Sequence, residues 1–163
     1  MYRSLVRVFT PAILAIVAAC ALVRAEENRP RGWLHLNGYT HHFAAPDANN
    51  QLYGAGVTWF HEKWGRIVQA WEADAFQDSG RKLSAYAGHS WTYREKHWHA
   101  GITAALMYHR NFVAQNRWRV LPVALPFVEL PLRRISLRAY YVPPVRSGSD
   151  QQIAVQILLP FVD

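Results

Sequence analysis

The chain has one cysteine among its 163 residues, Cys20, and it lies in an N-terminal apolar segment. Small secreted domains are often held together by disulfides, and a single cysteine cannot form one within the chain. If the N-terminal segment is removed, the mature protein has no cysteine at all. The fold must therefore be stabilised by backbone hydrogen bonds and side-chain packing.

Beyond residue 25 the chain also lacks a long apolar run, since no later stretch approaches the roughly 20 residues that a membrane-spanning helix requires. The first 25 residues have a different character. Two arginines precede an apolar stretch over residues 8–23, and Ala25 supplies a small residue at a cleavage position. This order is typical of a secretory signal peptide. We therefore expect residues 1–25 to be removed and residues 26–163 to form one domain.

Two other interpretations of this N-terminal segment remain open. It could be an uncleaved membrane anchor, although Pro11 and the shortness of the apolar run disfavour an anchor. It could instead be a lipoprotein signal ending at Cys20, although the apolar run continues beyond that residue. In each case the segment is separate from the domain that follows it.

The mature chain also has only a small excess of charge. The whole sequence carries 18 Lys and Arg against 11 Asp and Glu, a formal net charge of +7. Three of the arginines lie in the signal peptide, which leaves 15 basic side chains against the same 11 acidic ones. This bias is too small to indicate nucleic acid as a partner. It is compatible with exposed loops that meet anionic lipid headgroups.

What the chain does have is many aromatic residues, with Trp and Tyr distributed throughout. A secreted, cysteine-free chain of this kind is either a soluble β protein or an outer-membrane β-barrel, whose strands are individually weak signals. Alternating apolar and polar residues between turn residues predict eight strands. They cover residues 33–43, 51–60, 66–77, 84–93, 98–109, 119–129, 133–142 and 152–161.

The number, length and connections of these strands favour the barrel. Each has about the 9–11 residues that a tilted strand needs to cross a bilayer, and an even number suits a closed antiparallel barrel. The first, third, fifth and seventh connections are the longer ones. In such barrels both termini face the periplasm and the long loops lie outside. The alternation of connection lengths fits this arrangement.

The two faces of the strands indicate which side meets the membrane. Strand 98–109 carries aliphatic residues on one face, between aromatic residues at both ends, as a lipid-facing strip would. Other strands carry Glu72, Asp74, Arg134 and Arg138, which cannot face hydrocarbon and would neutralise each other inside. The sequence therefore predicts an all-β fold, an eight-stranded antiparallel transmembrane β-barrel. The sequence does not decide which face of the first strand points inward, because both of its faces carry apolar and polar residues.

The predicted topology brings reactive side chains to the outer rim of this barrel. The first strand ends there with His41 and His42, the third with Asp78 and Ser79, and the fifth with His109. An imidazole, a carboxylate and a hydroxyl are sufficient groups for acyl transfer. The alternatives are an ordinary Asp-Ser-Gly turn and histidines at headgroup level. The remaining histidines are not paired closely with cysteines or carboxylates, so we expect no metal site.

Six motifs, "GYTHHF", "YGAGVTW", "AFQDSG", "YAGHSW", "LPVALP" and "YYVPP", follow one another over essentially the whole mature chain. With these motifs the sequence resembles the lipid A palmitoyltransferase (PagP) family of Gram-negative outer membranes. The resemblance implies a monomeric outer-membrane barrel that transfers a fatty acyl chain from a phospholipid to a lipid A hydroxyl in the outer leaflet. The family's catalytic residues fall on His42, Asp78 and Ser79, with His41 as an alternative register for the histidine. His42 would be a general base oriented by Asp78, Ser79 would stabilise the carbonyl oxygen or attack it, and no cofactor is needed.

The resemblance also implies how lipid is accommodated. In the family a glycine of the fourth strand sets the depth of the acyl chain; Gly88 lies in the corresponding motif, and the matching position is Ser90. A serine there predicts a chain shorter than palmitate. Pro122, Pro126 and Pro143 cannot donate to a strand ladder, so they would open a lateral gap between strands six and seven, as in the family, unless they merely end strands.

A second lateral gap of the family, between strands one and two, is edged by prolines that this chain replaces with Asn37 and Leu52. The resemblance therefore gives no support for a second lipid route. Two alternative functions share the same scaffold. One is a structural or lipid-binding barrel without activity, and the other is a phospholipase that passes the acyl group to water.

Overall fold

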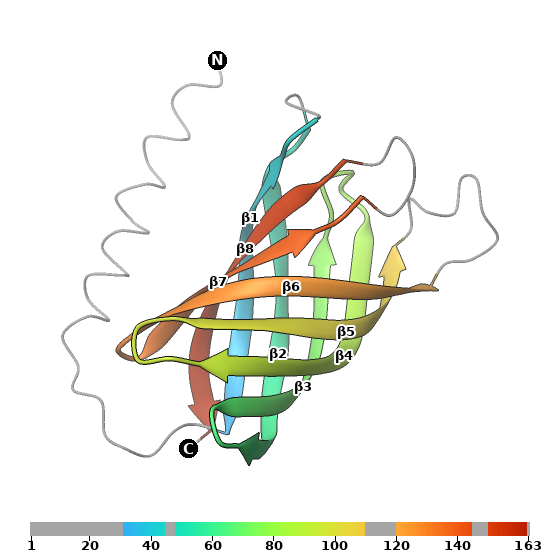
Figure 1. Cartoon of the computed structure of the whole chain (residues 1–163). Coiled ribbons are helices and arrows are strands. Elements are labelled where there is room, and N and C mark those ends of the chain that lie inside the picture. The colour runs from blue at the N-terminus through green and yellow to red at the C-terminus, as the bar shows by residue number, and fades with distance from the viewer. Residues whose placement is uncertain (1–30, 45–47, 110–119, 145–149, 163) are drawn as a thin grey trace.

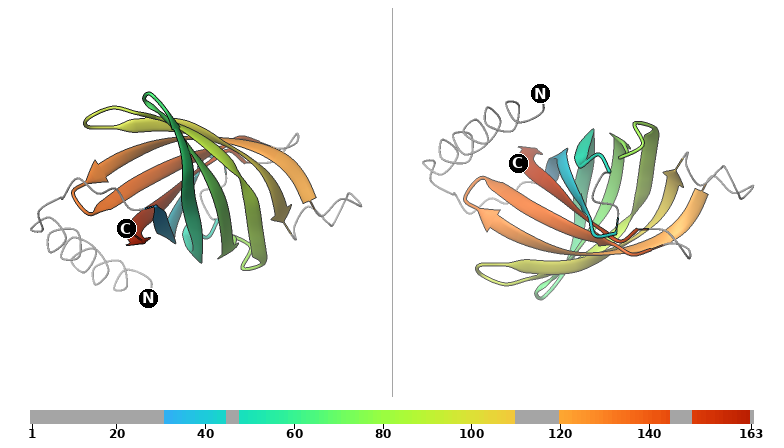
Figure 2. Two further views of the ribbon diagram at one scale, coloured as in Figure 1. Left: turned by 90° about the horizontal axis from the view of Figure 1, so that it is seen from below. Right: turned by 90° about the horizontal axis from the view of Figure 1, so that it is seen from above.

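The chain folds into a closed barrel of eight antiparallel strands. The computed structural model describes residues 31–44, 48–109, 120–144 and 150–162. The strands are β1 (Gly32–His42), β2 (Gln51–Trp64), β3 (Ile67–Gln77), β4 (Leu83–Arg94), β5 (His99–His109), β6 (Val120–Leu132), β7 (Ile135–Val142) and β8 (Gln152–Val162). Each strand pairs with the next, and β8 pairs with β1, so the sheet closes around one interior (Figures 1 and 2). This confirms the predicted all-β, eight-stranded antiparallel barrel.

The two ends of the barrel differ in their connections. Short turns join β2 to β3, β4 to β5, and β6 to β7, and we call this the turn end. The opposite end, which carries the other connections, is the loop end. Gly65 forms the β2–β3 turn with φ of 59°, a left-handed conformation that favours glycine. Arg133 takes a similar φ of 51° in the β6–β7 turn, and Arg134 beside it is exposed. The prediction that Arg134 faces the interior is therefore wrong, because β6 runs on to Leu132 and places Arg134 in the turn.

A bulge in β1 explains why neither face of this strand could be chosen from its sequence. The register of β1 against β8 shifts between Asn37 and Tyr39, so Gly38 is an extra residue. Before the bulge the buried side chains include His35 and Asn37, and after it they are Thr40 and His42. The inward set thus changes from odd to even positions. A strict period of two could not describe this strand.

The interior is polar at its centre, where a hydrogen-bond network includes Glu72, Thr103, Glu129, Arg138 and Tyr140. Arg138 is only 1% exposed and donates to Glu72 over 2.6 Å and to Glu129 over 2.9 and 3.0 Å. Tyr140 donates to Glu72 over 2.8 Å and accepts from Arg138 over 2.9 Å. Buried charges are tolerated when they are paired and hydrogen-bonded in this way. The expected internal pairing of acids with an arginine is confirmed for Arg138, and we call this set the central network.

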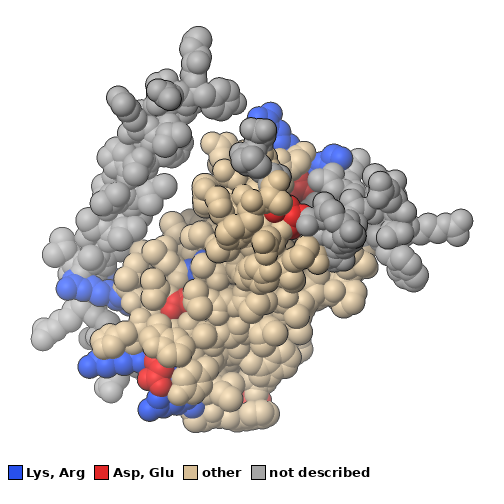
Figure 3. Space-filling view, turned by 45° about the horizontal axis from the view of Figure 1, so that its top comes forward, with Lys and Arg blue, Asp and Glu red and all other residues tan. Residues whose placement is uncertain are grey.

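The outer surface of the barrel is mainly apolar between its two ends. Among the described residues its exposed large side chains include Leu36, Tyr39, Val57, Trp59, Trp71, Leu83, Trp91, Ile102, Leu106, Val128, Leu130 and Phe161. On the face shown in Figure 3, most blue and red atoms lie toward the ends of the barrel, with a broad tan wall between them. The predicted outward strip of β5 is confirmed, because Ile102 and Leu106 are exposed while Thr103 and Met107 are buried. No helix in the described part of the chain is long and apolar enough to cross a membrane.

The wall is only partly paired between β6 and β7. Their ladder runs from the Phe127–Tyr140 pair to the turn end, and among the described residues no pair joins them closer to the loop end. There residues 120–126 of β6 pair only with β5, whereas Tyr141 and Val142 pair only with β8. The two strands diverge toward the loop end in Figure 1. By contrast, the β1–β2 ladder continues to the Tyr39–Gln51 pair, which keeps that seam closed.

Candidate functional site

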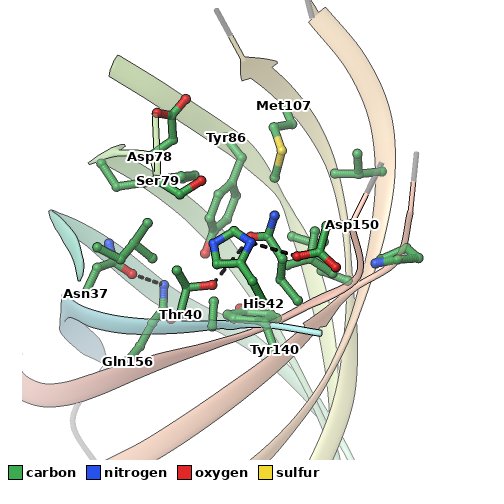
Figure 4. Close-up of a pocket in the computed structure, with 18 of the residues that line it drawn as sticks. Asn37, Thr40, His42, Asp78, Ser79, Tyr86, Met107, Tyr140, Asp150 and Gln156 are labelled. Atoms are coloured by element: carbon green, nitrogen blue, oxygen red, sulfur yellow. Dashed lines mark hydrogen bonds and ion pairs between the residues drawn. The ribbon is translucent and has the colours of Figure 1, made fainter. Parts of the chain in front are cut away.

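A cavity of about 500 Å³ occupies the loop-end part of the barrel interior (Figure 4). Its lining is divided into two kinds of wall. The polar wall comes from β1, β8 and the segment before β8, and includes Asn37, Thr40, His42, Asp150, Gln152 and Gln156. The apolar wall comes from β2 to β6 and includes Leu52, Phe76, Met107, Val123 and Leu125. Such a cavity suits a ligand with a long apolar part and a polar group to place against His42.

The bulge at Gly38 turns His42, and not His41, into this cavity. His41 lies on the outside, with its ring 4.9 Å from that of Phe43 in an edge-to-face contact. His42 is buried, and its Nδ1 lies 2.8 Å from a carboxylate oxygen of Asp150. Its Nε2 is buried without a hydrogen-bond partner. A carboxylate at Nδ1 favours the tautomer with the proton on Nδ1, which leaves the Nε2 lone pair available to accept a proton.

Asp150 joins this histidine to the backbone of the β1–β2 connection. Its second oxygen accepts a hydrogen bond of 2.7 Å from the backbone N–H of Ala44. Burial acts to raise the pKa of the Asp150 carboxyl, but the hydrogen bonds from Ala44 and His42 hold that pKa below its usual range. The carboxylate is therefore charged at neutral pH. It can stabilise the imidazolium that forms when His42 takes up a proton.

The Asp78–Ser79 pair forms part of a tight turn after β3. One Asp78 oxygen accepts from the Lys82 backbone over 2.9 Å, and the other accepts from the Ser84 hydroxyl over 3.3 Å. The Arg81 backbone N–H donates to the carbonyl of Asp78 over 2.8 Å, with Arg81 itself at a φ of 59°. This turn places both Asp78 and Ser79 in the cavity lining.

The structure thus brings together the three residues that the sequence singled out, but not in the expected pairing. His42, Asp78 and Ser79 all line the same cavity. The carboxylate on His42 is that of Asp150, whereas the oxygens of Asp78 are bound within their own turn. Sequence reasoning missed Asp150. The feature that could have revealed Asp150 is the register of β8. His42 pairs with Gln152, so an acid two residues before Gln152 must lie at the same rim.

The other histidines form no metal site within the described residues, where no group of three or more His, Cys, Asp or Glu side chains could hold a metal ion. His61 and His89 approach to 2.8 Å on the outer surface, beside Trp71. His99 lies 3.0 Å from Glu129 inside the barrel. The His109 side chain, which we placed at the outer rim, lies outside the described part of the structure.

Gly88 and Ser90 lie on the inner face of β4, deeper than the cavity. Neither residue lines it, and the lining residue of β4 is Tyr86. Ser90 is buried and its hydroxyl approaches the carbonyl of Ala70 over 3.5 Å. Tyr86 and Tyr140, rather than Gly88 or Ser90, therefore form the β4 and β7 parts of the cavity floor.

The prolines lie where the wall is unpaired. Pro122 and Pro126 belong to β6, and Pro143 follows the end of β7. Pro122 and Pro143 both line the cavity, on the two sides of the unpaired part of the β6–β7 seam. The cavity thus reaches the wall where strand pairing is missing.

Neither a scan of the chain against protein-family models nor a search of curated proteins gives a match. The chemical use of the site must therefore be argued from its geometry. A buried imidazole in the lining of an amphipathic cavity, with one nitrogen on a carboxylate and the other without a hydrogen-bond partner, is suited to remove a proton from a hydroxyl group. A nearby serine hydroxyl can donate to an oxygen on which negative charge develops.

Proposed function

We propose that this protein is an outer-membrane acyltransferase, which moves a fatty acyl chain from a phospholipid to a hydroxyl group of lipid A. The observation that carries the proposal is His42, buried at the cavity with Nδ1 on Asp150 and with Nε2 free of partners. The apolar wall of the same cavity offers a place for an acyl chain. The sequence resemblance to lipid A palmitoyltransferases supports the same reaction.

The outer surface supports a position in the membrane. Its exposed aliphatic and aromatic side chains would be costly in water over so wide a wall, and such a surface marks a protein or membrane contact. A closed barrel leaves no unpaired sheet edge to face lipid, apart from the short stretch between β6 and β7. We therefore place the apolar belt in the outer membrane, with the loop end facing outward.

The proposed step needs only the residues of this chain and its two lipid substrates. His42 Nε2 takes the proton from the acceptor hydroxyl, whose oxygen then attacks the ester carbonyl carbon of the phospholipid. Asp150 stabilises the resulting imidazolium. The tetrahedral intermediate collapses by breaking the bond to the lysophospholipid oxygen. That oxygen takes the proton back from His42, so atoms and charges balance.

Ser79 and Asp78 have separate roles in this proposal. The Ser79 hydroxyl donates to the carbonyl oxygen as it becomes negative, which is the group that most needs stabilisation in acyl transfer. Asp78 holds the turn that carries Ser79, through its bonds to Lys82 and Ser84. The acyl chain enters sideways through the unpaired seam flanked by Pro122 and Pro143. This route spares the chain from crossing the polar loop end.

The test compares two adjacent histidines in the same protein. Purified protein in detergent is given phospholipid with a labelled acyl chain together with lipid A. We expect labelled lipid A from the wild type, a loss of about 10²–10⁴-fold for His42→Ala, and a rate near wild type for the outward-facing His41→Ala. Ser79→Ala should also be slow. Labelled free fatty acid instead of labelled lipid A would identify a phospholipase, and no label release would identify a barrel without this activity.

A further inference from the structure

The turn end of the barrel carries an excess of exposed positive charge. Five exposed basic side chains lie at its strand ends and in its turns: Arg31, Lys63, Lys96, Arg133 and Arg134. None of the ion pairs within the described residues involves these five side chains, which we call the basic collar. Blue side chains lie together at the lower left of Figure 3, on the side where Figure 1 shows the β4–β5 and β6–β7 turns.

Acidic side chains do not balance this charge. Of the carboxylates that the structure describes at the turn end, that of Glu95 is already paired with Arg66. Glu129 is buried and bound to Arg138. This leaves Glu62, which is exposed and forms no ion pair within the described residues, against the five cations of the basic collar. The collar therefore suits a partner of opposite charge.

All six tryptophans that the structure describes lie at this same end. Each is in a connection there or in the half of its strand nearer to the turns: Trp33, Trp59, Trp64, Trp71, Trp91 and Trp98. Among the described residues, the exposed aromatic side chains toward the loop end are tyrosine and phenylalanine. Indole rings concentrate at the level of the lipid headgroups, so the tryptophans indicate where that level lies. Their position places the basic collar beside the headgroups of one leaflet.

We infer that the basic collar binds anionic phospholipid headgroups in the leaflet that meets the turn end. The inference rests on the membrane position argued with the proposed function, and it adds the class of lipid at this end. Each Lys or Arg near a membrane surface favours acidic lipids by about fivefold. A zwitterionic headgroup also has a phosphate, but its own cation cancels the negative charge that would attract the collar. The tryptophans favour lipid over an acidic protein as the partner, because they lie at the same end as the collar.

The test measures which lipids surround the turn end, and it needs no catalysis. The protein is reconstituted in phosphatidylcholine vesicles that contain either brominated phosphatidylglycerol or brominated phosphatidylcholine, and the quenching of tryptophan fluorescence is compared. Bromine quenches only at short range, so the tryptophans report on their neighbouring lipids. The lipids are ether-linked, so the proposed reaction cannot consume them. Trp118 lies outside the described residues, so every protein also carries Trp118→Phe.

Two arginines with the same backbone conformation provide matched variants. Arg133 has a φ of 51° in the β6–β7 turn, and Arg81 has a φ of 59° in the β3–β4 connection at the loop end. Both are exposed, and glycine adopts this conformation without strain, as Gly65 does with a φ of 59°. Arg133→Gly and Arg81→Gly should therefore both fold, and each removes one positive charge, but from opposite ends of the barrel. Lys96→Gln removes a charge of the collar from a different turn.

At low salt we expect the wild type and Arg81→Gly to prefer phosphatidylglycerol over phosphatidylcholine. Arg133→Gly and Lys96→Gln should each lower that preference about fivefold. In roughly 1 M salt, where the Debye length is about 3 Å, the preference should disappear. Equal preference in all four proteins, a preference that survives salt, or an equal loss in Arg81→Gly would overturn the inference. No quenching by either lipid would overturn it together with the membrane position, whereas the expected quenching without acyl transfer would refute only the proposed reaction.

Discussion

Replacing Arg138 with methionine provides the sharpest test of how the interior is stabilised. The substitution leaves the carboxylates of Glu72 and Glu129 buried without their cation, and breaking a buried ion pair in this way costs about 3–5 kcal/mol. Arg138 donates four hydrogen bonds to Glu72, Glu129 and Tyr140, and the variant loses all of them.

The assay is urea unfolding of the barrel in phospholipid vesicles, followed by tryptophan fluorescence and by electrophoretic mobility. Arg134→Met is the control, because Arg134 is exposed in a turn and its loss should change the free energy of unfolding by no more than about 0.5 kcal/mol. Combining Arg138→Met with Glu72→Gln and Glu129→Gln should recover much of the loss, since no buried charge is then left unpaired. If Arg138→Met unfolds within about 1 kcal/mol of Arg134→Met, the central network does not stabilise the barrel as argued.

Further predictions concern the candidate site and the packing of glycines in the barrel strands. Asp150→Asn should slow acyl transfer by about a hundredfold, and nitrogen NMR should show a changed tautomer at His42, which a purely structural effect would not produce. Because the pKa of Asp150 is lowered in the folded protein, its stabilising effect should be complete above its unfolded pKa and disappear as the pH falls through the folded value, which unfolding of wild type and Asp150→Asn over an acid pH series would reveal. Gly88→Ala should destabilise by about 1–3 kcal/mol in urea unfolding, because its Cβ would lie 2.6 Å from the Cβ of Ala105, whereas Gly38→Ala, with no atom within 4 Å, should change stability little.

The alternation of apolar and polar residues predicted most of the fold, because successive residues of a strand in a barrel wall face opposite environments. On β5 and β8 the period of two is unbroken, and their limits were predicted to within one residue. The charged positions on β3 and β7 indicated which face of each strand points inward, and Glu72, Asp74 and Arg138 are all buried. A pattern of single residues is sufficient when the strand is regular and one face is uniformly apolar.

The site was less accessible from the sequence, because it depends on register and not on local pattern. The bulge at Gly38 decides which of two adjacent histidines faces inward, and a glycine in a strand indicates a bulge only weakly. The pairing of His42 with Asp150 joins residues 108 positions apart. Asp78 was predicted to orient the histidine. Its carboxylate instead accepts hydrogen bonds from the Lys82 backbone and the Ser84 hydroxyl.

The cavity and the central network meet at Tyr140, and this has a consequence for both. Tyr140 lines the cavity, and its hydroxyl contacts Glu72, Arg138 and Thr103. The polar centre of the barrel therefore also forms the floor under the proposed acyl chain. A phenylalanine at position 140 would keep the floor but remove bonds to Glu72 and Arg138, so it should lower stability before it alters the cavity.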